Sequence, residues 1–233
     1  MNLIVFDIDG TLTHSEMDTK CFAQAIEDVL QVNNLDTDWS SYRYSTESGI
    51  LKEIYELLTD RIPTEQEITS IQKLFVTYLN NTLSENPSLI VPIPGANTIF
   101  QKIYKLSNWH IGIATGGWKI SALFKLDSAN IPHSTIPKAY SDDHIERAEI
   151  IKTAIRHAQS HNKITQYQKI FYVGDRPWDE HAAMQLGIDF IGVGDFIKQK
   201  SQHFCVDNYN DSDSDSFLTH LEKINKRSHH LAN

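Results

Sequence analysis

The chain alternates between short apolar runs and longer segments in which apolar residues recur at helical spacing. Four apolar runs predict strands, because continuous runs of this kind are typical of strands covered on both faces in a parallel sheet. They occupy residues 3–6, 111–115, 170–175 and 188–193. Residues 131–139 predict a weaker strand. Helical patterns separate these strands, and the alternation predicts a doubly wound, Rossmann-like α/β fold.

Residues 14–85 interrupt this alternation, because they contain helical patterns and no strand pattern. Two segments in this block keep a helical period, and a third helix is expected to begin at Thr64. Thr64 and Glu67 match the capping box of a helix N-terminus. The sequence therefore predicts an α/β core domain formed by residues 1–13 and 86–233, and an inserted all-helical domain formed by residues 14–85.

The composition narrows the class of protein. The 233 residues are enough for one large α/β domain or for a core with a small accessory domain. A net charge of -9 without a Lys/Arg stripe argues against nucleic-acid binding. We find no apolar run that would span a bilayer, no visible secretory signal and only two cysteines, Cys21 and Cys205, expected as free thiols. We therefore expect a cytoplasmic monomer or weak dimer without a nucleic-acid or membrane partner.

Reactive groups follow three of the expected strands. The carboxyl ends of parallel strands lie along one edge of the sheet, and open α/β folds bind their ligands there. The groups expected at this edge are two carboxylates, a hydroxyl with two glycines, and two further carboxylates: Asp7 and Asp9, Thr115 with Gly116 and Gly117, and Asp175 with Asp179. Side chains two apart in an extended chain point to the same side, so Asp7 and Asp9 are predicted to face one site.

Carboxylates, a hydroxyl and glycine amides together suit a hard cation that holds a phosphate group. Mg²⁺ takes one or two carboxylates and accepts phosphate oxygens among its other ligands. Asp7 would then attack phosphorus as a carboxylate nucleophile. Asp9 is placed to give a proton to the leaving alcohol and later to take one from water. A nearby positive charge is also needed, because Asp7 and a phosphoryl dianion repel one another.

These motifs resemble those of a known family. Asp7-Ile-Asp-Gly-Thr-Leu-Thr13 resembles the first motif of the haloacid dehalogenase superfamily of phosphohydrolases, and residues 111–115 resemble the second. Gly174-Asp-Arg-Pro-Trp-Asp179 resembles the fourth motif. The helical block between the first and second motifs matches the position of the family's α-helical cap, as in phosphoglycolate phosphatase and β-phosphoglucomutase relatives.

The resemblance implies a role for each residue. Asp7 is the nucleophile and a metal ligand, while Asp9 is the acid/base and binds the metal through its backbone carbonyl. Asp175 ligates Mg²⁺, and Asp179 supports the site directly or through water. The expected phosphate-binding groups are those of the second motif: Thr115, Gly116 and Gly117. Retention of Asp9 favours phosphatase or mutase chemistry over dehalogenation, because the family's dehalogenases lack this second acid.

The third motif departs from the family pattern. The family usually has a Lys, often in Lys-Pro, shortly before the helix that precedes the last acidic strand, and this chain has no Lys-Pro between residues 139 and 171. Arg147, Lys152 and Lys138 are the candidates for this positive charge. Arg147 is favoured by its place at the helix entrance, and its forked guanidinium can supply a fixed charge. The alternative is a solvated Arg147 on a helix flank.

The hydroxyl-rich segment of residues 42–50 is the best candidate for substrate contact in the cap. Arg43 would pair there with a second anionic group of the substrate, or would form a surface ion pair with Glu47. Trp118 and Trp178 would either line the entrance or pack in the core. The leading hypothesis is a Mg²⁺-dependent phosphatase acting on a small phosphorylated metabolite. The alternatives are a sugar-phosphate mutase, and a regulatory or protein-binding member of the fold.

Overall fold

The central element is a parallel sheet. The computed structural model describes residues 1–230, with side chains up to residue 223. Within these residues, six parallel strands form one sheet in the order β5-β4-β1-β6-β7-β8. Their bounds are Asn2–Phe6 (β1), Trp109–Ala114 (β4), Lys138–Ala139 (β5), Ile170–Gly174 (β6), Asp189–Val193 (β7) and Cys205–Val206 (β8). The expected doubly wound α/β core is confirmed.

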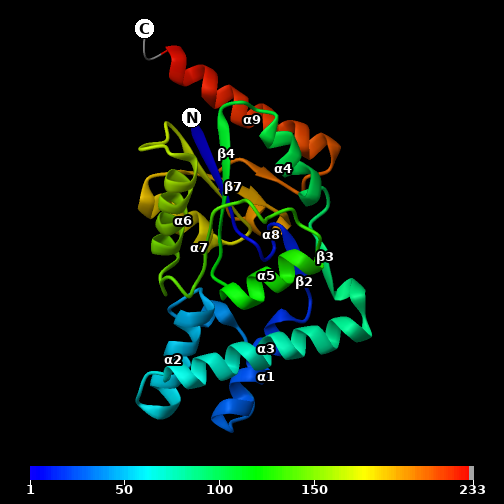
Figure 1. The fold of residues 1–233 in the computed structure, drawn as a ribbon, viewed down its shortest axis with the longest axis vertical. Coiled ribbons are helices and arrows are strands. Elements are labelled where there is room, and N and C mark those ends of the chain that lie inside the picture. Colours follow the sequence, from blue (N-terminus) through cyan, green and yellow to red (C-terminus); the bar gives the residue numbers. More distant parts are fainter. Residues whose placement is uncertain (231–233) are drawn as a thin grey trace.

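Helices cover both faces of this sheet (Figure 1). α4 and α9 pack on one face, and α6, α7 and α8 pack on the other. α5 lies near the carboxyl edge of the sheet and contacts the inserted helices. The bounds are Ala96–Tyr104 (α4), Lys119–Ser128 (α5), Arg147–Asn162 (α6), Pro177–Leu186 (α7), Asp195–Lys198 (α8) and Asp211–His230 (α9).

Strand β1 is buried on both sides, as its continuous apolar sequence predicted. Leu3 and Val5 belong to the hydrophobic cluster shared with α6 and α7, whereas Ile4 and Phe6 belong to the cluster shared with α4 and α9. Phe6 lies against three aromatic rings, those of Phe100, Tyr209 and Phe217. The end of β1, and with it Asp7, is therefore held by packing from two directions.

The inserted block is helical. Its elements are α1 (Asp18–Leu30), the 3₁₀ turn η1 (Trp39–Ser41), α2 (Glu47–Thr59) and α3 (Glu65–Glu85). The capping box of Thr64 and Glu67 is formed at the start of α3, as predicted. α1 and α3 pack against one another below the sheet in Figure 1. We refer to residues 14–85 as the cap.

Two short strands join the cap to the core. β2 (Thr13–Ser15) pairs antiparallel with β3 (Ile90–Pro92), and the 3₁₀ turn η2 (Pro87–Leu89) leads into β3. The chain thus leaves the core and returns to it through neighbouring segments. The sequence did not predict β2 and β3, because three residues are too few to show a period.

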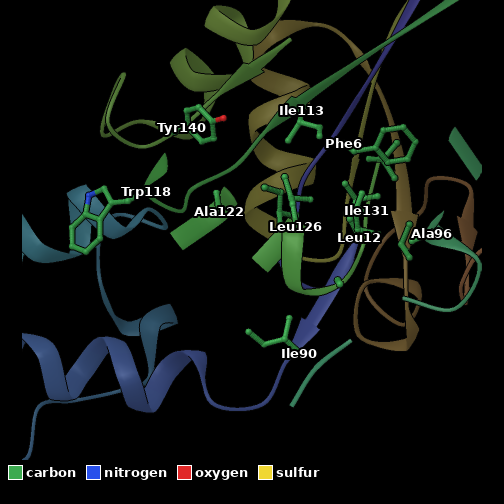
Figure 2. Packing of buried hydrophobic residues seen from close by; sticks show 14 of the residues in the cluster. Phe6, Leu12, Ile90, Ala96, Ile113, Trp118, Ala122, Leu126, Ile131 and Tyr140 are labelled. Carbon is green, nitrogen blue, oxygen red and sulfur yellow. The ribbon is translucent and has the colours of Figure 1, made fainter. Parts of the chain in front are cut away.

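One hydrophobic cluster extends from the sheet into the cap (Figure 2). Phe6 and Leu126 belong to its core part, and Trp118 lies on the cap side, where its ring meets Phe22 at 5.4 Å and Phe75 at 6.5 Å between centroids. Trp118 is fully buried. Of the two alternatives for Trp118, packing is therefore the one found, and the cap and the core share apolar contacts.

Some boundaries differ from those expected. The weak strand of residues 131–139 is reduced to β5, because Pro132 and Pro137 lack the N–H group that a ladder requires. β8 and α8 were not expected, and α9 begins at Asp211 rather than at residue 216. In the part of the chain that the structure describes, no helix is long and apolar enough to cross a bilayer.

Replacing Phe6 by Ala tests the central role of β1. We expect Phe6→Ala to lower the free energy of unfolding by about 3–5 kcal/mol, because the cavity would lie among packed aromatic rings. Urea unfolding followed by circular dichroism measures the change. Met184→Ala on the exposed side of α7 is the control and should change stability by no more than about 0.5 kcal/mol. Equal effects of the two substitutions would contradict this assignment of the core.

Candidate active site

Three carboxylates meet at the carboxyl edge of the sheet. Asp7 follows β1, Asp175 follows β6, and Asp179 lies in the first turn of α7. One oxygen of each side chain lies within 4.8 Å of the others, and all three residues are buried. The structure thus brings together the three carboxylates whose side chains were predicted to bind a metal, from segments up to 172 positions apart in the chain.

Two glycines make this approach possible. Gly10 has a φ of 74°, and a Cβ atom on it would lie 2.1 Å from the Asp175 carboxylate oxygen Oδ2. A Cβ atom on Gly174 would lie 2.5 Å from the Cβ of Asp179. Any larger residue at either position would push a carboxylate away, so the glycines of the first and fourth motifs shape the cluster.

The cluster is short of positive charge. Burial raises the pKa of Asp7 well above its usual value, and the negative charge of Asp179 adds to this effect. Burial, followed by the charge of Asp179, also raises the pKa of Asp175 to about 7. The oxygen Oδ1 of Asp7 is buried without a hydrogen-bond partner. Close, buried carboxylate oxygens of this kind fit a hard divalent cation such as Mg²⁺.

Arg147 lies inside the cluster. Its Nη1 is 2.9 Å from Oδ1 of Asp179 and 3.5 Å from Oδ1 of Asp7, and its side chain is only 10% exposed. Lys152 instead forms an exposed ion pair, and Lys138 donates to two backbone carbonyls. Of the three candidates for the third-motif cation, the structure places only Arg147 beside Asp7. The alternative of a solvated Arg147 on a helix flank is wrong.

The second motif lies directly under the cap. Thr115 is buried, and its Oγ1 accepts a 3.0 Å hydrogen bond from the N–H of Gly117. A Cβ atom on Gly116 would lie 2.5 Å from Nη2 of Arg147 and 2.8 Å from the carbonyl oxygen of Ser45. Gly116 therefore allows three segments of the chain to meet: the loop after β4, the start of α6 and the cap.

Asp9 faces a different partner from Asp7. Its Oδ2 lies 2.7 Å from Nζ of Lys125, which is also 3.1 Å from Oδ1 of Asp18 in the cap. The Lys125 side chain is fully buried. Burial alone would lower the pKa of Lys125, but the neighbouring carboxylates of Asp18, Asp9 and Glu47 raise it above its usual value. Asp7 and Asp9 were predicted to face one site. The structure confirms this only in part, because the Asp9 carboxylate pairs with Lys125 instead of joining the cluster around Asp7.

Glu47 is a further buried acid, which the sequence predicted only as a possible surface partner of Arg43. It is the first residue of α2, and its Oε2 accepts hydrogen bonds from the N–H of Trp118 at 2.7 Å and from the hydroxyl of Ser121 at 3.1 Å. Burial raises the pKa of Glu47 to about 8. The Glu47 backbone N–H also donates to the carbonyl of Gly116 at 2.8 Å. The cap therefore inserts a carboxyl group beside the second motif.

Arg43 lies away from the carboxylate cluster. Its guanidinium rests 4.7 Å from the centroid of the Tyr44 ring, and the residue is exposed. Glu47 points into the interface, so the alternative of a surface ion pair between these two residues is wrong. Ser45, two positions further on, is the residue that reaches the core: its carbonyl accepts from Nη2 of Arg147 at 2.7 Å. A substrate contact of Arg43 stays a prediction.

Sequence reasoning also missed two cations. Lys125 occupies the buried face of α5 together with Ala122 and Leu126, so a charged residue at an apolar position of the predicted helix was the available signal. Arg176, inside the fourth motif, places its Nε 2.9 Å from Oδ2 of Asp175. Trp178 is half-buried in the same motif.

Comparison with known proteins identifies the family. Residues 4–193 match the family model of haloacid dehalogenase-like hydrolases. The chain belongs to this family, as its motifs predicted. A comparison with curated proteins gave no match.

Solved structures share the fold over most of the chain. A hydrolase from Pseudomonas syringae is 18% identical, with a TM-score of 0.68, covering 96% of this chain and 99% of that one. A predicted phosphoglycolate phosphatase from Haemophilus somnus is 18% identical, with a TM-score of 0.57 and coverages of 89% and 94%. A candidate β-phosphoglucomutase from Bacteroides vulgatus is 14% identical, with a TM-score of 0.60 and coverages of 92% and 86%. At these identities the comparisons establish the fold.

Glu47→Gln should make the protein's stability less dependent on pH. Folding raises the pKa of Glu47 from 4.5 to about 8, so the stability that depends on its protonated form is complete below pH 4.5 and is lost as the pH rises through about 8. Gln does not titrate. Thermal unfolding should therefore show a larger fall in Tm from pH 6 to pH 9 for the wild type than for the variant.

The exposed acid Glu85 provides the matched control for this experiment, since Glu85→Gln removes a carboxyl group at the end of α3. This control should follow the pH dependence of the wild type. If Glu47→Gln and Glu85→Gln behaved alike, the titration of a buried Glu47 would be contradicted.

Proposed function

We propose that this hydrolase is a Mg²⁺-dependent phosphatase that cleaves a small phosphorylated metabolite through an aspartyl-phosphate on Asp7. The observation that carries the proposal is the buried cluster of Asp7, Asp175 and Asp179, with Arg147 inside it and one Asp7 oxygen free of hydrogen bonds. A nucleophilic carboxylate, a cation site and a fixed positive charge are the groups that phosphoryl transfer to a carboxylate needs.

The chain supplies binding groups for both the metal and the phosphate. Asp7, Asp175 and Asp179 would hold Mg²⁺, joined by the backbone carbonyl of Asp9. When bound, the ion would offset the repulsion between the nucleophile and the phosphoryl dianion. The Thr115 hydroxyl and the Gly116 amide would hold the phosphoryl oxygens at the end of the neighbouring strand β4. The Gly117 N–H, which donates to Oγ1 of Thr115, would orient that hydroxyl or turn to the phosphate when it binds.

Two proton transfers by Asp9 complete the reaction. In the first step, an Asp7 oxygen bonds to phosphorus, the bond from phosphorus to the leaving oxygen breaks, and Asp9 gives its proton to that oxygen. In the second, the Asp9 carboxylate takes a proton from water while the water oxygen bonds to phosphorus and the Asp7–phosphorus bond breaks. Oδ1 of Asp9 is buried without a hydrogen-bond partner, which suits it for this exchange. Arg147 provides a constant positive charge beside Asp7.

The cap contacts support a role for the cap in admitting the substrate. Ser45 binds Arg147 through its carbonyl, and its hydroxyl accepts from Nε of Arg147 at 3.2 Å. The Glu47 N–H binds the carbonyl of Gly116. These groups lie where a phosphate would meet the second motif, so we infer that the cap separates from the core before the substrate enters.

A panel of phosphorylated metabolites tests this function. We expect the purified protein to release inorganic phosphate from at least one phosphomonoester in the presence of Mg²⁺ and to stop when EDTA removes the ion. Asp7→Asn should be inert, because an amide oxygen is a poor nucleophile and loses the negative charge of the carboxylate. Asp215→Asn, an exposed acid in α9, should retain full activity.

The same panel separates the alternatives. Isomerisation of a hexose phosphate with little phosphate release would replace phosphatase by sugar-phosphate mutase. A folded wild-type protein that neither hydrolyses nor isomerises any phosphomonoester would contradict both enzymatic functions, leaving the regulatory or protein-binding alternative.

Mg²⁺ should also stabilise the protein, which gives a readout that is independent of turnover. At 100 times the dissociation constant, binding to the native state alone contributes about 2.7 kcal/mol. We expect Mg²⁺ to raise the Tm of the wild type and to leave that of Asp175→Asn unchanged. Asp195→Asn, an exposed acid at the start of α8, is the control and should keep the full rise. An equal rise in Asp175→Asn would place the ion elsewhere.

A further inference from the structure

Lys125 is a fully buried lysine that none of the motifs accounts for. It projects from α5 and is surrounded by carboxyl groups from both parts of the molecule. Asp9 belongs to the core, while Asp18 is the first residue of α1 in the cap. Burial of an ammonium group is expensive unless opposite charges compensate it. The position therefore needs an explanation beyond the packing of α5.

The two oxygens of Asp9 are in different situations. Oδ2 accepts a 2.7 Å hydrogen bond from Lys125, whereas Oδ1 is buried and has no hydrogen-bond partner. A carboxyl group is planar and rigid, so fixing one oxygen limits the directions in which the other can point. A hydrogen bond to a charged donor is also about twice as strong as a neutral one. Lys125 thereby leaves Asp9 with one defined free oxygen.

We propose that Lys125 is the positioning residue of the acid/base: its ammonium group holds Oδ2 of Asp9 and directs Oδ1 toward the leaving-group oxygen. The inference rests on the proposed function, because it requires Asp9 to exchange protons with a substrate. Lys125 itself contacts no reacting atom in this arrangement. Its role is to keep Asp9 in one orientation through both proton transfers.

The second bond of Lys125 connects this orientation to the cap. Nζ lies 3.1 Å from Oδ1 of Asp18, so the same ammonium group is held from the cap side. Movement of α1 away from the core would remove this anchor and leave only the bond to Asp9. Lys125 is therefore best fixed when the cap is docked, which is also when the proposed reaction takes place.

Substrates with different leaving groups test the inference. Expulsion of an alkoxide requires a proton from Asp9, whereas p-nitrophenolate leaves without one. We expect Lys125→Met to reduce kcat/KM for an alkyl phosphate on the order of 100-fold, the lower end of what a positioned acid contributes. The value for p-nitrophenyl phosphate should fall by less than about fivefold. Because kcat/KM covers only the steps up to departure of the alcohol, the later hydrolysis of the aspartyl-phosphate does not obscure the comparison.

A double-mutant experiment shows whether Lys125 acts through Asp9. In the Asp9→Asn background, Lys125→Met should cause no further loss on the alkyl phosphate, because the acid is already absent. Lys125→Arg should restore part of the activity, since it keeps the charge and a donor. If Lys125→Met does not fold, Lys125→Met/Asp18→Asn removes one carboxylate together with the ammonium and preserves the local charge balance. The kcat/KM values for the alkyl phosphate and for p-nitrophenyl phosphate are then compared in this double variant.

The outcomes distinguish this inference from the proposed function. A wild-type protein without turnover would contradict the proposed function and the inference with it. An active wild type, combined with equal losses on both substrates in Lys125→Met, would contradict the inference alone. A further loss in the Asp9→Asn background would do the same, because it would show that Lys125 acts through general packing rather than through Asp9.

Discussion

The concentration of negative charge at the carboxyl edge of the sheet is the constraint on which the rest of the site depends. Asp7, Asp175 and Asp179 are buried within 4.8 Å of one another, an arrangement that is unfavourable unless positive charge compensates it. Packing of β1 from both faces fixes Asp7 there, and Gly10 allows Asp175 to approach. The fold thus holds negative charges close together at a point where a divalent cation would compensate them.

Two buried cations divide the carboxylates between them, and each also binds the cap. Arg147 pairs with the cluster around Asp7 and holds the carbonyl of Ser45, while Lys125 pairs with Asp9 and with Asp18 of the cap. A lysine in place of Arg147 would lack the fork that reaches both partners at once. This offers a physical reason for the departure from the family's third motif: docking of the cap and compensation of the acidic cluster depend on the same side chain.

The features of the structure that could be predicted from the sequence are those that depend on local patterns of residues. Apolar runs that end in Asp7, Thr115 and Asp175 specify both the strands and the edge at which their polar ends meet. The contacts of Lys125 and Glu47 could not be assigned in this way, because they form only when α5 meets α1 and α2 across the interface between cap and core. The same holds for β2 and β3, whose three-residue strands are specified by their pairing rather than by their own composition.

The interface between cap and core combines apolar packing with buried polar groups, and the two respond differently to separation. Trp118 packs against Phe22 and Phe75 through many weak dispersion contacts that require no particular direction. The hydrogen bond from the backbone N–H of Trp118 to Glu47 is directional, and separation would leave a buried carboxyl group without this donor. If the cap separates from the core, water would solvate Glu47 and Asp18. This hydration would offset part of the free energy lost with the polar contacts. For the proposed phosphatase, the docked interface would exclude water from the site, and the separated interface would admit a charged substrate.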